Sequence, residues 1–263
     1  MSVSAPALPP TELRRRITAI DALRGLVMLV MLLDHVRETV YLHLQVRDPM
    51  DVSSTPPELF FSRLAAHFCA PIFVFLTGLS AWLYAHPAAG PARSARGFLF
   101  KRGLFILVLE LTIVSYAWTA KVPWVIYLQV MYAIGVSMMA LSLLHTWPPR
   151  VLAGIGLLLV AGHNALDGTQ VPADSAWHPL WTLLLQRGPL IEHDGLVVKV
   201  SYPVLPWIGV ILLGYVAGPL FAGRVDPGWR RRTLLWLGVG CWLASAPMWA
   251  RASASRPCGR CGY

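Results

Sequence analysis

The chain has 263 residues, of which 56% are hydrophobic and 13% are charged, and its mean hydropathy is +0.57. Soluble domains typically carry about 25% charged residues, so this composition excludes an ordinary soluble domain and favours a polytopic helical membrane protein. The net charge of +9 does not indicate nucleic-acid binding, because the basic residues lie between apolar runs, where they act as topology signals and contact anionic lipids.

Apolar segments of helix length follow one another along the chain. They run from about 18 to 41, 60 to 85, 99 to 118, 123 to 144, 150 to 164, 201 to 221 and 233 to 250. Each is close to the roughly 20 residues that cross a hydrocarbon core. We therefore predict an all-α, polytopic transmembrane bundle of about seven membrane helices over residues 14–250.

Two tails and one long loop complete this predicted organisation. The Ala/Pro/Ser-rich residues 1–13 predict a disordered N-terminal tail, and the Pro/Cys/Gly/Arg-rich residues 251–263 predict an unstructured C-terminal tail. The loop 165–198 contains a stretch, 177–186, that is compatible with a short interfacial helix.

Lys and Arg residues are divided unequally between the two sides of this predicted bundle. Apart from Arg24 and the C-terminal tail, twelve lie toward the side of the N-terminus and six toward the other side. Cytoplasmic loops of membrane proteins carry the excess of basic residues. The bias predicts a cytoplasmic N-terminus and a multi-pass protein of the inner (plasma) membrane. It places Asp21 and Arg24 near the cytoplasm and His35, His67, His163 and Asn164 near the outer face.

The first apolar segment carries ionisable residues that a plain membrane anchor would not tolerate. At about 100° per residue, a helix brings six side chains into one arc of about 100°. These are Asp21, Arg24, Met28, Met31, His35 and Glu38. Ionisable groups at membrane depth are costly and usually face a bundle interior or a water-filled cavity. We therefore predict a functional inner stripe, with Arg24 and His35 about 16 Å apart along the helix axis.

The cytoplasmic end of this stripe is a candidate site for an anionic cofactor. Asp21 and Arg24 can pair one helical turn apart, which either fixes helix packing or prepares the arginine for a ligand. A guanidinium binds phosphate through two parallel hydrogen bonds. Lys101 and Arg102 are expected at the same cytoplasmic level and would join Arg24 around the phosphates of a nucleotide-containing donor.

The outer end of the stripe is a candidate catalytic site. His35 has a pKa range suited to general base catalysis, and Glu38 one turn later could orient its ring. The alternative is a buried histidine bonded to a neighbouring helix. The expected proximity of His67, His163 and Asn164 favours catalysis. Three histidines could also bind a metal, but no HxxxH or paired-carboxylate spacing supports this, and we expect no metal.

Several motifs along the chain resemble one family of membrane enzymes. Arg16-x4-Asp21-x2-Arg24-Gly25, closed by Asp34-His35, resembles the opening helix of the heparan-alpha-glucosaminide N-acetyltransferase catalytic-domain family. The stretch from His67 to Gly78 resembles the second helix of that family. Further similarities are Lys101-Arg102-Gly103, Leu128-Gln129-Val130, Gly162-His163-Asn164 and Tyr202-Pro203-x2-Pro206-Trp207. Together they cover about residues 14–222.

The resemblance implies an integral membrane acyltransferase. It would move an acetyl or acyl group from cytoplasmic acyl-CoA, with acetyl-CoA as the donor, to an amino-sugar or polysaccharide acceptor on the outer side. A histidine would act as the general base or carry the acyl group. Relatives in animal lysosomes have an asparagine in the place of His35 and a later catalytic histidine, for which His43 stands nearest here; we prefer His35.

Other partners and other functions also follow from these patterns. Membrane lipids are expected partners, a homodimer is compatible with the sequence, and nucleic acid is not expected. A non-catalytic transporter or exporter of a small polar or glycan substrate would line its path with the same charges. An inactive, truncated remnant is the third reading, because the family usually continues through further helices.

Overall fold

The computed structural model describes residues 18–40, 55–88, 90–119, 124–166, 169, 171–172, 174–193, 195–222 and 225–254. The first half of this part contains α1 (Thr18–Val40), α2 (Pro57–His67), α3 (Cys69–Ala85), α4 (Arg96–Leu109), the π-helix Glu110–Val114, α5 (Ser115–Thr119) and β1 (Trp124–Leu128). The second half contains α6 (Val130–Leu144), α7 (Pro149–Gly162), the 3-10 turn His163–Leu166, α8 (His178–Leu184), β2 (Gly188–His193), β3 (Leu196–Val200), α9 (Leu205–Ala217), the 3-10 turn Gly218–Phe221 and α10 (Pro227–Ala254).

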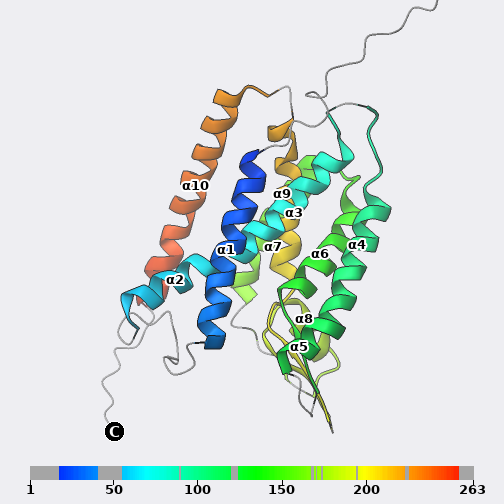
Figure 1. Ribbon diagram of the computed structural model, residues 1–263, viewed down its shortest axis with the longest axis vertical. Coiled ribbons are helices and arrows are strands. Elements are labelled where there is room, and N and C mark those ends of the chain that lie inside the picture. The colour runs from blue at the N-terminus through cyan, green and yellow to red at the C-terminus, as the bar shows by residue number, and fades with distance from the viewer. Residues whose placement is uncertain are drawn as a thin grey trace, which may run out of the picture.

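The long helices form an antiparallel bundle (Figure 1). The segments α1, α2–α3, α4–α5, α6, α7, α9 and α10 run alternately down and up the bundle in Figure 1. Each corresponds to one of the apolar segments that the sequence predicts. We call the end of the bundle at which α1 begins the N-terminal end, and the opposite end the sheet end, because the strands lie there (Figure 1).

Prolines set several helix starts a few residues away from the predicted ones. α2, α7 and α10 begin at Pro57, Pro149 and Pro227, where the prediction had about 60, 150 and 233. Proline suits the first helical position because an N–H group there would have no partner within the helix.

The last helix, α10, continues to Ala254, four residues into the predicted tail 251–263. The other tail residues lie outside the described part of the chain.

One helix in the described part of the chain is long and apolar enough to cross a membrane. It is the continuous helix Pro57–Ala85, of 29 residues, formed by α2 and α3. The apolar helices Val130–Leu144, Pro149–Gly162 and Leu205–Phe221 have only 10–17 residues. α1 has 23 residues but carries five charged residues, Asp21, Arg24, Asp34, Arg37 and Glu38. The structure is thus mostly helical with one candidate membrane span.

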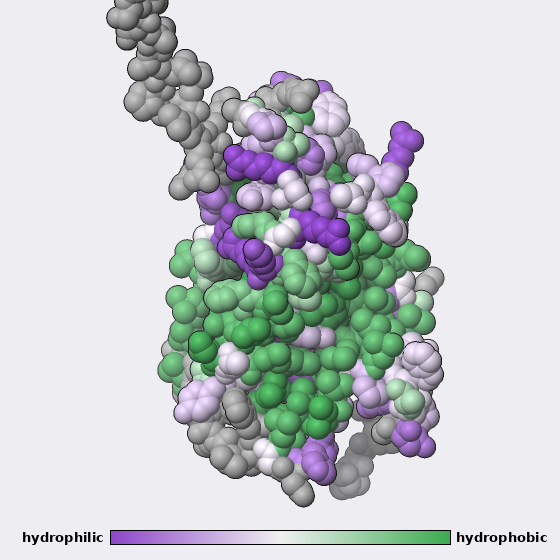
Figure 2. All heavy atoms as spheres, turned by 90° about the vertical axis from the view of Figure 1, so that its right-hand side faces the viewer, coloured by the Kyte–Doolittle hydropathy of each residue, from purple (hydrophilic) through white to green (hydrophobic). Residues whose placement is uncertain are grey.

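Apolar side chains also gather on the outside of the bundle. Figure 2 shows them as a broad band across the middle of one face, with polar side chains concentrated toward both ends. On α4 the exposed members include Leu104, Phe105 and Val108, which are 43%, 64% and 50% exposed. A surface of this extent suits contact with lipid or another protein better than contact with water.

The core lies between α3, α4, α6, α7 and α9. Its fully buried side chains include Val74, Leu99, Leu141, Leu152 and Ile211, one from each of these helices. Glycines bring two helix pairs close together: a Cβ on Gly103 of α4 would lie 2.6 Å from the carbonyl oxygen of Gly135 in α6, and a Cβ on Gly209 of α9 would lie 2.8 Å from that of Gly156 in α7. Close approach of backbones at small residues is typical of helix packing in membranes.

A three-stranded sheet at the sheet end corrects the prediction of an all-α fold. β3 lies in the middle, parallel to β1 and antiparallel to β2. The predicted fourth span, 123–144, therefore divides into β1 and α6, and the predicted loop 165–198 contains β2 and most of β3. The short helix predicted near 177–186 is present as α8.

Side-chain type explains why these segments form strands. Val125, Ile126 and Tyr127 in β1, and Val197, Val198 and Val200 in β3, are β-branched or aromatic residues that favour extended backbone. Gly195 has a φ of 85°, a left-handed conformation that closes the turn from β2 to β3. On the inner face of the sheet, Leu128, Val198 and Val200 pack with Tyr132 and Val204.

Candidate functional site

One face of α1 packs against α2 and α3, and it differs from the predicted stripe. Among the side chains of α1 that the structure describes, the buried ones are Ile20, Val27 and Asp34, seven residues apart. The stripe residues Asp21, Met28 and His35 each lie one position later, about 100° around the helix, and are exposed. Of the other stripe residues, Arg24 and Met31 are half-buried. Burial of the apolar Ile20 and Val27 determines which face of α1 points inward. Asp34 lies on the same face and is therefore buried too.

Asp34 is the centre of an ionic cluster that we call the Asp34 cluster. Its Oδ1 accepts a hydrogen bond from Nη2 of Arg37 at 2.8 Å, and its Oδ2 accepts one from Nη1 of Arg63 at 2.7 Å. Arg37 is one turn later on α1, whereas Arg63 belongs to α2. A buried carboxylate needs such partners, because removal from water is costly for an unpaired charge. The cluster therefore joins α1 to α2.

A second polar contact joins α1 to α3 nearer the N-terminal end. A guanidinium nitrogen of Arg24 lies 3.6 Å from Oδ1 of Asp21, and the other terminal nitrogen donates to Oγ of Ser80 in α3. Between the two levels, the thiol of the buried Cys69 donates to the carbonyl oxygen of Val27 at 3.6 Å. The Asp21–Arg24 pair predicted from the sequence is present, with the arginine also bonded to a neighbouring helix.

His67 and His163 share one tautomer. Nδ1 of His67 lies 2.7 Å from the carbonyl oxygen of Arg63, and Nδ1 of His163 lies 2.7 Å from that of Val160. A carbonyl oxygen only accepts hydrogen bonds, so each Nδ1 carries the proton and each neutral ring presents Nε2 as a base. His67 is exposed at the end of α2, and His163 is half-buried at the end of α7.

The three predicted histidines come from different helices. His35 lies on α1 and His67 at the junction of α2 and α3, which pack against α1, whereas His163 follows α7, which packs against α9. In the described part of the chain, no three His, Cys, Asp or Glu side chains are grouped in a way that could hold a metal ion. The side chains of Glu38 and Asn164 and the whole of His43 lie outside what the structure describes.

The predicted basic residues around the donor phosphates lie on two separate helices. Lys101 and Arg102 are exposed on α4, and the guanidinium of Arg102 lies over the ring of Phe98, 5.6 Å from its centroid. α4 packs against α6, whereas α1 with Arg24 packs against α2 and α3. Figure 1 shows α1 and α4 toward opposite sides of the bundle. Arg24 and the Lys101–Arg102 pair therefore do not form one phosphate site in this conformation.

Glu110 is a buried acidic residue that the predicted site leaves out. It opens the π-helix after α4, and its Oε1 accepts the backbone N–H of Gln129 at 2.8 Å, directly before α6. Its own carbonyl oxygen accepts a bond from Oγ of Ser115 at 2.7 Å. A π-helical turn inside an α-helix frequently marks a functional site. The sequence signal was available, because Glu110 is the acidic residue of the apolar segment 99–118.

Asp34 and Arg63 are the main residues that reasoning from the sequence missed. The prediction that the whole charged stripe faces inward favours His35 over its neighbour Asp34. The available signal was the seven-residue spacing Ile20, Val27 and Asp34, which marks one face of a helix.

The comparisons with known proteins point to one family. The family model described as "Heparan-alpha-glucosaminide N-acetyltransferase, catalytic" matches residues 16–246. Neither the search of curated proteins nor the search of solved structures finds a match. The matched range includes all of the long helices described above except the last residues of α10.

Proposed function

Because the chain belongs to the heparan-alpha-glucosaminide N-acetyltransferase catalytic family, we propose that it moves an acetyl group from acetyl-CoA to an amino or hydroxyl group of a sugar or glycan. The family supports an acetyltransferase-like function, and the match over residues 16–246 is the observation that carries the proposal. The identity of the donor, the identity of the acceptor and the direction of transfer are our proposal and go beyond the family match.

We further propose that the bundle crosses the inner membrane seven times with the N-terminus in the cytoplasm. The alternating direction of the helices and the apolar band on the outer surface support this arrangement (Figures 1 and 2). Basic residues also collect at the N-terminal end, at the ends of α3, α4, α7 and α10. The described ones are Arg93, Arg96, Lys101, Arg102, Arg150, Arg230, Arg231 and Arg232. Such an excess marks the cytoplasmic side.

With this orientation, α1 presents polar residues at two depths. Arg24 lies toward the cytoplasmic end, where the phosphates of the donor arrive, and His35 lies toward the sheet end, where the acceptor arrives. Arg24 is half-exposed, so its guanidinium is open to a ligand as well as bonded to Ser80. In this proposal Lys101 and Arg102, across the bundle on α4, bind lipid headgroups rather than the donor.

The transfer needs one base and no redox step. The acceptor nitrogen or oxygen gives its proton to Nε2 of a histidine and bonds to the thioester carbonyl carbon. The carbon–sulfur bond breaks, and the thiolate of CoA leaves and takes up the proton. We assign the base to His35, which follows Asp34 directly and is exposed, and we rank His67 next because its Nε2 is unprotonated in the neutral ring.

Acetyl transfer by the purified protein tests the proposed function. The detergent-solubilised protein is incubated with acetyl-CoA and glucosamine, and CoA release and acetylated product are measured together by thiol titration and mass spectrometry. We expect both to rise in equal amounts. Release of CoA without acetylated glucosamine means that water hydrolyses the thioester, which would contradict glucosamine as the acceptor. Uptake of glycans into vesicles without any need for acyl-CoA would show a transporter and overturn the proposal.

A further inference from the structure

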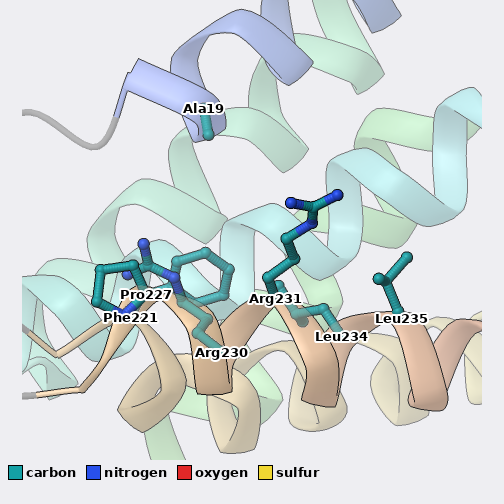
Figure 3. Close-up of a pocket in the computed structure, with 7 residues that line it drawn as sticks. All are labelled: Ala19, Phe221, Pro227, Arg230, Arg231, Leu234 and Leu235. Carbon is teal, nitrogen blue, oxygen red and sulfur yellow. The ribbon is translucent and has the colours of Figure 1, made fainter.

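A pocket lies at the N-terminal end of the bundle, between α1, the turn Gly218–Phe221 and α10 (Figure 3). Its volume is about 350 Å³. Five of its lining residues are apolar: Ala19, Phe221, Pro227, Leu234 and Leu235. The other two are Arg230 and Arg231. An apolar pocket with two cationic groups suits a ligand that is itself both apolar and anionic.

The two arginines hold different positions in this pocket. The guanidinium of Arg230 lies over the ring of Phe221, 5.6 Å from its centroid. The side chain of Arg231 extends from α10 toward α1, on the side of Ala19 (Figure 3). The nearby carboxylate of Asp226 accepts the backbone N–H of Trp229 at 2.7 Å. Two guanidiniums from consecutive residues can bind a phosphate group with several charge-assisted hydrogen bonds.

Exposed apolar side chains continue from the pocket along the two helices. On α10 they include Leu234 and Leu235, which are 38% and 59% exposed. On α1 they include Leu26 and Leu29, which are 58% and 66% exposed. Acyl chains attached to a phosphate in the pocket could lie against these surfaces.

We propose that this pocket binds the headgroup of an anionic phospholipid, with the phosphate on Arg230 and Arg231 and the acyl chains along α1 and α10. The inference rests on the proposed membrane location. That location puts the pocket at the cytoplasmic leaflet, where anionic lipids attract clustered basic residues. The neighbouring Arg232 is exposed but does not line the pocket, so it provides a test of pocket binding against general attraction by charge.

Native mass spectrometry of the detergent-purified protein tests the site. Phosphatidylglycerol and phosphatidylcholine with the same acyl chains are added to the wild type, to the pair Arg230→Gln/Arg231→Gln, and to the matched pair Arg150→Gln/Arg232→Gln. Both pairs remove two positive charges from the same end of the bundle. We expect the pocket pair to weaken phosphatidylglycerol binding roughly tenfold, since charge-assisted bonds to phosphate are lost, and the matched pair to change it less than about twofold.

A third variant keeps the site testable if the pocket pair fails to fold. Ala19→Trp fills the pocket from an exposed position without changing a charge, and should also weaken phosphatidylglycerol binding. Equal binding of the two lipids, or an equal loss in the pocket pair and the matched pair, would overturn the lipid site. Loss of acetyl-CoA binding in the pocket pair, with unchanged lipid binding, would overturn it in favour of a donor site.

The same preparations separate this proposal from the proposed function. A chain that is recovered without membranes, or that transfers no acetyl group, contradicts the proposed function. A membrane-bound, active chain that shows no preference for phosphatidylglycerol contradicts only the lipid site.

Discussion

Asp34 in α1 and Arg63 in α2 are joined by a hydrogen-bonded ion pair, with Oδ2 and Nη1 2.7 Å apart. The side chain of Asp34 is only 11% exposed, and Arg37 contacts its other oxygen. The first helix is therefore attached to the second by a charge pair rather than by apolar packing alone.

Removal of the Asp34 charge should destabilise the fold. Asp34→Asn leaves two guanidiniums without their common anion, and we expect a loss of about 3 kcal/mol, near the lower end for a broken buried pair because Arg63 is partly exposed. Unfolding in detergent, followed by circular dichroism, measures it. Asp21→Asn is the matched control: it breaks an exposed pair and should cost less than about 1 kcal/mol. Equal losses of unfolding free energy in the two variants would contradict a stabilising role of Asp34 between α1 and α2.

His35→Ala should abolish acetyl transfer and leave the fold intact. The side chain is exposed, so its loss creates no cavity, whereas removal of a general base typically costs about 100-fold to 10,000-fold in rate. CoA release and thermal unfolding are measured on the same sample. His86→Ala is the control. His86 is an exposed histidine that directly follows the C-terminal end of α3, and it is not part of the proposed site. Wild-type activity in His35→Ala would refute the assignment to His35.

His67 gives a second test of the base, because its Nδ1 is fixed by the carbonyl oxygen of Arg63. If His67 were the base, His67→Gln would abolish transfer and His35→Ala would only weaken it. We expect the reverse order. The ratio of the kcat values of the two variants decides between the two histidines. His86→Gln is the control, because Nδ1 of His86 lies 3.1 Å from the carbonyl oxygen of Trp82 and the variant loses the same kind of local contact as His67→Gln.

Arg24→Ala should raise the KM for acetyl-CoA more than it lowers kcat. A lost charge-assisted contact with phosphate predicts a rise of roughly tenfold or more. Lys101→Ala and Arg102→Ala should change KM by less than about twofold. Ser80→Ala removes the partner of Arg24 on α3 but keeps the charge, so it separates packing from donor binding. A larger effect of Lys101→Ala than of Arg24→Ala would place the donor at α4.

Replacement of a glycine by alanine should destabilise the protein where two helices are in close contact, and not where the glycine faces open space. Gly103→Ala would place its Cβ 2.6 Å from the carbonyl oxygen of Gly135, so α4 and α6 must separate, at a cost of about 1–3 kcal/mol. Gly154→Ala in α7 meets nothing within 4 Å and should be neutral or stabilise by about 0.5–1 kcal/mol. Thermal unfolding compares the two. Equal melting temperatures would contradict the close approach of α4 and α6.

The positions of the helices could be predicted from the sequence because each follows a run of apolar residues. The strands could not be recognised in the same way. Only Leu128 and Gln129 separate Val125, Ile126 and Tyr127 from the apolar residues of α6, so a count of hydrophobic residues joins them into one span. Asp194-Gly195, a dipeptide typical of hairpin turns, was the signal that indicated β2 and β3.

Only part of the candidate site could be predicted from the sequence. The ion pair of Asp21 and Arg24 follows from local spacing, because residues three apart on a helix are neighbours. The bond between Asp34 and Arg63 joins residues on different helices, and its existence depends on which face of α1 is inward. That face is decided by packing against α3, through side chains such as Leu76 and Leu79, which contact Ile20. The seven-residue spacing of Ile20, Val27 and Asp34 indicates that face, but no local pattern identifies Arg63 as the partner of Asp34.

The parallel pairing of β1 with β3 also has a consequence for synthesis. Leu128 pairs with Val200, and the N–H groups of Ser201 and Tyr202 donate to the carbonyl oxygen of Leu128 at 3.0 and 3.2 Å. β1 leaves the ribosome long before β3 does, and at about 10 residues per second the delay is several seconds. During that time its backbone groups have no strand partner. The emerging chain thus has an interval in which this edge is open to chaperones or to pairing with another nascent copy.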